Sequence, residues 1–191
     1  MSETMAVLKK GGGGSAQVGP TNPAPVTGRD YSSSVSIGRP ENATDYAALD
    51  VIGIADAGTP ASAGSAIIEF ENIGPVGGGE IILVDWDLTI GLTAVTSGMA
   101  GFRLHLYSAS PTAILDNAAF DLKDADRATH LGYIDVGTPV DMGSNLFAQS
   151  DQINKSFILT SSSLFGQLKT IGGYTPASAT VYIPRLRAIG A

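Results

Sequence analysis

Two histidines are the first residues to test for acid–base or metal chemistry, because histidine titrates closest to neutral pH. His105 alternates with Arg103 and Tyr107 on the polar face of a predicted strand, which favours an exposed or interface residue. His130 ends a stretch with helical character, where a histidine suits the negative end of the helix dipole. No paired-histidine spacing of a zinc site occurs, and a chain with no cysteine offers no thiolate.

Carboxylates gather in two places. One group comprises Asp116, Asp121, Asp124 and Asp126. Its spacing does not match an EF-hand loop, so helix capping (by Asp121 or Asp124) and solvation explain it better than calcium binding. Asp85 and Asp87 lie two residues apart on one strand face, whereas glycoside hydrolysis needs two carboxyl groups across a cleft, about 5–9.5 Å apart. We interpret this second pair as a polar strand face.

Glycine-rich stretches at residues 11–14 and 77–79 invite a phosphate-binding interpretation. Neither is followed by Gly-Lys-Ser/Thr or by the start of a helix, so both are predicted to be turns or linker. A Gly-x-Ser-x-Gly nucleophile motif is also missing from the sequence. We therefore predict no catalytic residue, no metal ligand and no cofactor, and expect a protein that is not an enzyme.

The elements that must position these groups are predicted to be strands. Apolar residues occupy every second position of the run 80–90, namely Ile82, Val84, Trp86, Leu88 and Ile90. A second alternating run covers residues 102–107, after a turn at 96–99, and the chain is organised around this strand–turn–strand unit. Period 2 places one face of each strand on a core, and two such strands need a second sheet to cover them.

Further strands are predicted at residues 46–53, 66–71, 130–136, 155–161, 164–171 and 179–187, with a short pairing near 146–147. Helical character is confined to residues 114–130. Because Pro184 lies inside the last strand, we expect that strand to be bulged or at a sheet edge. Eight or nine strands and at most one short helix predict an all-β fold, a jelly-roll-like antiparallel β-sandwich.

Residues 1–40 are predicted to form an extended, Gly/Pro-rich N-terminal arm, and residues 41–191 the sandwich domain. The Gly-Gly-Gly-Gly-Ser run at 11–15 is linker-like, and the prolines of 19–25 favour extended backbone. Two interpretations stay open: a disordered tail, or a tether that becomes ordered on a partner. In the second, residues 31–37 add an edge strand there.

Charge is divided unevenly along the chain. The arm holds four bases and two acids, a net charge of +2, while the remainder has a net charge of −9. An acidic domain without a basic stripe argues against nucleic acid as a partner. The N-terminus lacks the apolar segment of a signal peptide, and no apolar run approaches the ~18 residues of a membrane span. We expect no membrane partner.

Four segments follow one another in a distinctive order: Phe102–Pro111, Leu115–Leu122, Asp126–Asp135 and Tyr174–Pro176. In this order the chain resembles, over roughly residues 45–189, a group of tailed-bacteriophage virion proteins of the capsid decoration (cement) type. The resemblance implies a jelly-roll module on the outside of the head that clamps neighbouring capsomers. It brings no catalytic residues, and the arm lies outside it.

The partners that the resemblance implies are the major capsid protein and further copies of the chain. A capsid three-fold site favours a homo-oligomer that is a trimer, because cyclic symmetry repeats each contact. The implied location is the outer capsid surface of the virion, after synthesis in the host cytoplasm. The candidate capsid-contacting residues of the arm are Lys9, Lys10, Arg29, Tyr31, Val35, Ile37 and Arg39.

An alternative function is that of a tail, baseplate or head-fibre component that binds host glycan, since jelly rolls also form lectins. Tyr107, Tyr133 and Tyr174 are the aromatic residues that would stack on sugar rings. Packing in the core or at an interface is the competing explanation for all three.

Overall fold

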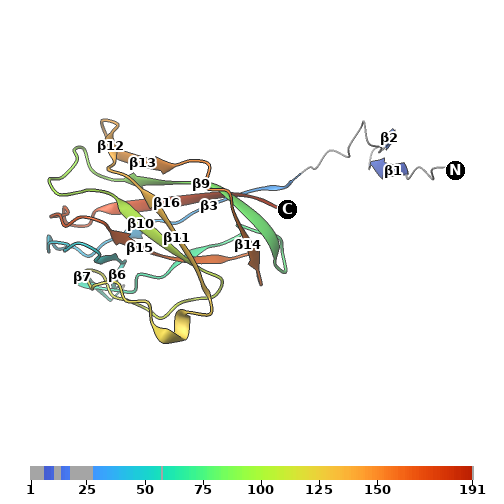
Figure 1. Cartoon of the computed structure of the whole chain (residues 1–191). Helices are drawn as coiled ribbons and strands as arrows, with labels where there is room; N and C mark the ends of the chain where they lie inside the picture. The colour runs from blue at the N-terminus through green and yellow to red at the C-terminus, as the bar shows by residue number, and fades with distance from the viewer. Residues whose placement is uncertain (1–6, 11–13, 18–27, 57, 191) are drawn as a thin grey trace.

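A computed structural model describes residues 7–10, 14–17, 28–56 and 58–190 of the chain. Its regular structure is almost entirely β, and two antiparallel sheets stack face to face as a sandwich (Figure 1). Among the described residues, helix is limited to one 3₁₀ turn, η1 (Asp124–Asp126), and no helix there is long and apolar enough to cross a membrane. The predicted all-β sandwich is confirmed.

The larger sheet, here sheet I, has seven strands in the order β12-β13-β9-β16-β3, with β14 also pairing with β9 and β4 with β16. Its strands are β3 (Asp30–Ser34), β4 (Ile37–Gly38), β9 (Gly79–Ile90), β12 (Val140–Asp141), β13 (Leu146–Ser150), β14 (Lys155–Leu159) and β16 (Val181–Gly190).

Sheet II has five strands in the order β11-β10-β15-β5, with β8 also pairing with β15. Its strands are β5 (Val51–Ile52), β8 (Ile68–Phe70), β10 (Phe102–Tyr107), β11 (His130–Val136) and β15 (Leu164–Thr170). In the described residues, two small hairpins are the remaining strands: β1 (Val7–Lys10) with β2 (Gly14–Gln17), and β6 (Ala55–Asp56) with β7 (Thr59–Ala63).

The strand order is that of a jelly roll. The eight principal strands in chain order are β3, β5, β9, β10, β11, β13, β15 and β16. Numbered one to eight, they lie as 1-8-3-6 in sheet I and as 2-7-4-5 in sheet II. This alternation between the two sheets is the double Greek key of a jelly roll.

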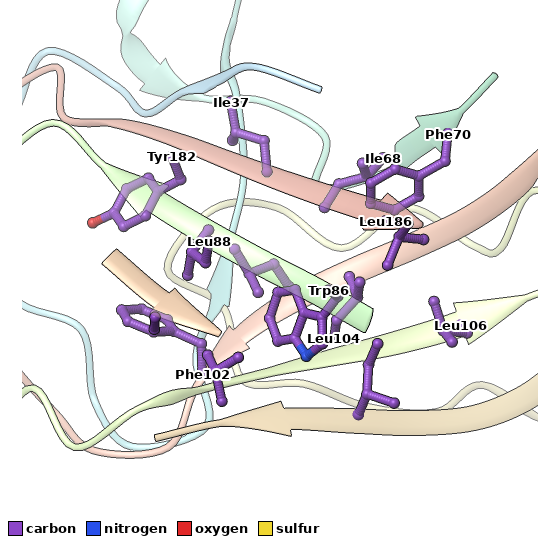
Figure 2. Packing of buried hydrophobic residues seen from close by; sticks show 14 of the residues in the cluster. Ile37, Ile68, Phe70, Trp86, Leu88, Phe102, Leu104, Leu106, Tyr182 and Leu186 are labelled. Carbon is purple, nitrogen blue, oxygen red and sulfur yellow. The ribbon is translucent and has the colours of Figure 1, made fainter. Parts of the chain in front are cut away.

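The core lies between the sheets and explains the alternation seen in the sequence. Trp86 and Leu88 from sheet I and Phe102, Leu104 and Leu106 from sheet II are fully buried. Figure 2 shows these side chains pointing into one shared space. As predicted, the apolar positions of residues 102–107 all face this core, which stabilises the fold by the burial of apolar surface.

Strand β9 departs from the predicted period-2 pattern at one residue. Arg187 of β16 pairs with Asp85, but Ala188 pairs with Leu83, so Val84 is an extra residue opposite the partner strand. Such a β-bulge reverses the side-chain phase. Ile81 and Leu83 are therefore fully buried, whereas the predicted core residue Val84 is half-buried.

The same bulge exposes Ile82 in part, which corrects the prediction that Ile82 faces the core with Trp86. The two long strands are also not paired with each other. Strand β9 lies in sheet I and β10 in sheet II, so residues 91–101 cross from one layer to the other instead of closing a hairpin.

The first jelly-roll strand comes from the segment assigned to the arm. Residues 30–34 and 37–38 pair with β16 in one continuous register, from Ile189↔Asp30 to Val181↔Gly38. Sheet I thus already includes part of the segment 1–40. The strand 179–187 is therefore not an edge strand, although it does face the bulge of β9.

Pro184 fits inside the sheet because of a break in its neighbour. Val35 donates its amide N–H to the carbonyl of Pro184 (3.1 Å), at the gap between β3 and β4. Since the N–H and C=O of one strand residue point to the same side, the missing N–H of Pro184 also faces that gap. No ladder bond to β9 is lost.

Two predicted elements are much shorter than expected. Helical character at 114–130 reduces to η1, whose N-cap residue is Lys123, with no side-chain cap from Asp121 or Asp124. The predicted strand 46–53 reduces to β5 and two isolated bridges, Tyr46 with Tyr174 and Asp50 with Ala119. In both segments, loop hydrogen bonds replace a regular ladder.

Truncation separates the structural part of the N-terminal segment from the rest. A chain starting at Glu41 lacks β3 and β4, and it also lacks the buried side chains of Ile37 and Arg39. We expect its free energy of unfolding in urea to be lower by roughly 3 kcal/mol or more than that of a chain starting at Gly28, from lost apolar burial and hydrogen bonds. Equal stability of the two chains would contradict this role of β3 and β4.

Candidate interaction surface

The outer face of sheet I carries a row of apolar side chains. Direct cross-strand partners run from Val140 to Phe147, from Phe147 to Thr89 and from Thr89 to Ile183. Val140 is 63% exposed and Ile183 38%. Since neighbours directly across a ladder share one face, these four residues, three of them apolar and the fourth Thr89, form a continuous strip, called here the apolar row.

A row of ion pairs lies beside the apolar row. Arg185 donates from Nε and Nη2 to Oδ2 of Asp87 (2.9 and 2.7 Å), and Arg187 reaches the same oxygen at 3.4 Å. Arg187 also pairs with Asp85 through Nε and Oδ1 at 2.8 Å. The side chain of Asp87 is only 3% exposed, whereas the two arginines are 45% and 42% exposed.

This arrangement confirms that Asp85 and Asp87 form a polar strand face, and it shows what they do there. Each carboxylate is neutralised by an arginine from β16, which lies next to β9 in the same sheet. Both carboxylates are therefore engaged in ion pairs within the sheet. An apolar strip beside half-exposed charges has the make-up of a protein–protein interface.

Two hollows flank the first residues of β3. One, of about 300 Å³, is lined by β3, β9 and β16 and includes Asp85, Arg187 and Ile189. The other, of about 260 Å³, lies between Arg29 and the turn that carries Asn72 and Val76. Asp30, Tyr31 and Ser32 line both hollows, so the segment enters sheet I between two depressions.

The candidate arm residues divide into three groups. Lys9 and Lys10 belong to the hairpin β1–β2. Arg29 is exposed and its guanidinium lies 5.7 Å from the ring centre of Tyr31, which is half-buried like Val35. Ile37 (3% exposed) and Arg39 (1% exposed) are buried in the chain's own domain. The last two therefore hold the segment in place and are not available to a partner.

Arg39 is held by a dense set of polar contacts. Its Nη1 donates to the carbonyl of Asn42 (2.6 Å) and to that of Ala177 (3.3 Å), and its Nη2 to Oδ1 of Asn42 (3.0 Å). Nη2 also lies 3.8 Å from Oδ2 of Asp116, whose side chain is 2% exposed. This buried ion pair links the first strand to the 108–129 segment.

Asp116 is fixed from two further sides. Its Oδ1 accepts hydrogen bonds from the hydroxyl of Tyr46 (2.6 Å) and from the amide of Gly53 (2.9 Å). Burial, with the neighbouring carboxylate, raises the pKa of Tyr46 above its usual value.

Burial also raises the pKa of Tyr182 to about 12, and the hydroxyls of Tyr174 and Tyr182 lie 2.6 Å apart. These phenols stay neutral across the physiological range.

The polar face of β10 is covered, which corrects the prediction of an exposed His105. His105 is 6% exposed and its ring stacks on Phe120 at 3.9 Å. His130 does not end a helix but begins β11, and its Nε2 lies 3.1 Å from Nδ1 of His105. The residues 108–129, called here the covering segment, produce this burial.

The carboxylates at 116–126 are also explained without a metal. Asp126 accepts from the amide (3.1 and 3.0 Å) and the hydroxyl (3.1 Å) of Thr112, and Asp116 from Tyr46 and Gly53. Asp121 and Asp124 pair with Lys123 and Arg127 at the surface. Within the described residues, no three His, Asp or Glu side chains converge as metal ligands would.

Two of the three tyrosines named for glycan stacking are buried, and the third is partly covered. Tyr107 is 1% and Tyr174 4% exposed. Tyr133 is 44% exposed, but the guanidinium of Arg103 covers one ring face at 3.7 Å while also bonding Asp135. The packing explanation holds for Tyr107 and Tyr174, and the structure offers no observation that favours the glycan-binding alternative.

The apolar row was not predicted from the sequence, although a signal exists. In the strand 181–189, Val181 and Ile183 alternate with Tyr182 and Leu186, so apolar residues occupy both faces. Period-2 analysis assigns one face to the core, and the apolar residues left on the other face mark a second contact surface.

Comparisons with known proteins leave the family open. No family model matches the chain, and no curated protein matches it. Among solved structures, the chain aligns with a native virion of Kashmir bee virus at acidic pH, at 11% identity over 97% of this chain and 89% of the other, with a TM-score of 0.24. Infectious bursal disease virus (Gx strain) aligns at 8% identity over 96% of this chain and 45% of the other, with a TM-score of 0.16.

Both are virus structures, and the chain spans less than half of the second. At TM-scores this far below 0.5 the alignments carry no argument about fold or function. The jelly-roll assignment rests on the strand order of the two sheets.

A double-mutant cycle tests the ion pair that anchors the first strand. Arg39→Met and Asp116→Asn each leave a buried charge without its partner, so each is expected to lower the free energy of unfolding by roughly 3 kcal/mol or more. The double variant removes both charges, and a coupling energy on the order of 1 kcal/mol or more is expected in urea denaturation. Strictly additive effects would show that the two charges do not interact.

Proposed function

We propose that the protein is a structural component of a virion, a decoration protein that binds the outer capsid surface and stabilises the junctions between capsomers. The observation that carries the proposal is the outer face of sheet I, where the apolar row and the ion-pair row lie side by side. The partner we propose for this face is the major capsid protein. The resemblance of residues 45–189 to phage decoration proteins supports the same function.

The N-terminal segment supplies a second contact in this proposal. Its end at β3 is fixed in sheet I, where Asp30 pairs with Ile189, so residues before Gly28 start from a defined point beside the two hollows. Tethering makes the second contact effectively intramolecular and raises avidity. We assign Lys9, Lys10, Arg29, Tyr31 and Val35 to this contact, and leave out Ile37 and Arg39 because they are buried.

Adhesion, and not catalysis, is the chemistry this surface supports. The exposed fractions of Val140 and Ile183 leave apolar area to bury, and the arginines beside them can pair with a partner's acids. We further propose that copies of the chain assemble as a trimer, since three-fold symmetry would repeat each contact at a capsid three-fold site. In light scattering we expect a particle mass three times that of the 19.5 kDa chain.

Co-sedimentation with expanded phage heads that lack their decoration protein tests the proposal. Ile183→Asp is expected to weaken head binding at least roughly tenfold, because a charge replaces an apolar side chain at the contact. Val95→Asp is the matched control, since Val95 is also 38% exposed but lies in the loop 91–101. Equal binding by both variants would remove sheet I as the docking face.

The chain starting at Gly28 tests the tether separately, because it keeps β3 and β4. We expect it to bind heads more weakly than the full chain, with a smaller loss at high salt where charge contacts are screened. Undiminished binding would remove the proposed role of Lys9 and Lys10. Failure of the full chain to bind heads would remove the decoration function itself.

A further inference from the structure

A histidine pair, the buried His105 and the half-buried His130, lies where the covering segment meets sheet II. Phe120 of this segment stacks on the ring of His105 with an interplanar angle of 20° and a centroid distance of 3.9 Å. On the other side, Nδ1 of His105 lies 3.1 Å from Nε2 of His130. One ring therefore donates the shared proton to the other, and the pair accommodates a single proton between these two nitrogens.

A second proton on His105 itself has no satisfied position in this arrangement. Nε2 of His105 is buried and has no hydrogen-bond partner, so a proton there would be unsatisfied. Protons on both Nδ1 of His105 and Nε2 of His130 would direct two N–H groups at each other across 3.1 Å. The geometry alone therefore disfavours the charged form of His105 while Phe120 is in place.

The groups that face His105 add to this effect. Its own strand contributes Arg103 and Tyr107, β15 contributes Lys169 and Gln167, and β11 contributes His130, Tyr133 and Asp135. Lys169 is 6% exposed, and its Nζ lies 4.4 Å from the ring centre of Phe120. Asp135 is the one acid in this set, and it is bonded to Arg103 at 2.7 and 2.8 Å.

We propose that His105 and His130 form an acid-sensitive lock, which holds the covering segment on sheet II at neutral pH and releases it when His105 takes up a proton. Release of Phe120 admits water to Nε2 of His105 and lets Lys169 become hydrated. The inference is independent of the proposed capsid binding.

The pKa shifts of His105, His130 and Lys169 all disfavour protonation in the closed form. Burial, with the positive charge of Lys169 and the neighbouring His130, lowers the pKa of His105 to about 3, and burial also lowers the pKa values of His130 and Lys169. A lowered pKa in the closed form means that the open form binds more protons. The closed form is therefore fully favoured above the ordinary histidine pKa of about 6.5 and loses stability as the pH falls from there toward 3.

Hydrogen exchange by NMR tests the lock, because the amide of Phe120 donates to the carbonyl of Leu49 (3.0 Å) and exchanges only when the covering segment opens. Between pH 7.5 and 4.5 the protection factor of this amide is expected to fall on the order of 100-fold. Amides of β10 serve as the internal reference for global unfolding. Parallel loss of protection at both places would overturn the proposal.

Two variants separate the histidines from the nearby acid. His105→Gln is expected to make the protection of Phe120 independent of pH over the same range. Asp126→Asn, which alters the carboxylate that holds Thr112 in the covering segment, is expected to keep the dependence. The reverse pattern would assign the pH response to Asp126 and overturn the proposal.

The native chain gives a test that needs no variant. It contains two histidines, so both imidazole titrations can be followed individually by NMR. His105 is expected to titrate well below 6.5, with the Phe120 ring signals changing in the same pH interval. Titration of His105 near 6.5 without a change at Phe120 would show that the charged imidazole fits the closed form.

Discussion

Sheet I depends on one extra residue in its longest strand. Strand β9 bonds to β16 along one side and to β14 and then β13 along the other. The bulge at Val84 lies where the second side changes from β14 to β13, and the amide of Ile153 from the connecting loop donates to the Val84 carbonyl at 3.0 Å. A bulge increases the local twist of a strand, which lets β9 pair with β16, β14 and β13.

The bulge also determines which residues of β9 face the core and which face outward. Ile81 and Leu83 before it, and Trp86 and Leu88 after it, all reach the core. As a result, Val84 and Asp85 both lie on the outer side of the sheet, next to Arg187 and the larger of the two hollows beside β3. The charged part of the candidate surface is therefore a direct result of the change of phase that keeps the core closed.

Period-2 alternation was enough to predict the all-β sandwich and most of the core, including every apolar residue of 102–107. It failed where non-local pairing decides the outcome. A one-residue bulge leaves no mark on composition, so Ile82 and Val84 were assigned to the wrong face. The serine-rich segment 31–37 is predicted from the sequence to add an edge strand to a partner, whereas it pairs with β16 of its own chain as the first strand.

Burial of polar groups was the harder part of the site to predict. His105 and Tyr107 alternate as exposed residues would, and only the path of the covering segment buries them. Arg39 and Asp116 lie 77 positions apart, and nothing in local spacing pairs them. The apolar row was missed for a related reason, since period-2 alternation assigns a single buried face to each strand.

The continuous pairing of β3 and β4 with β16 has a mechanical consequence. Ladder hydrogen bonds run perpendicular to the strands, so tension along the segment axis loads all of them together in shear, with the buried Arg39 side chain behind them. Tension across the axis would instead break them one after another from Asp30. The direction of pull, and not only its strength, therefore sets how firmly the sandwich holds its own leading segment.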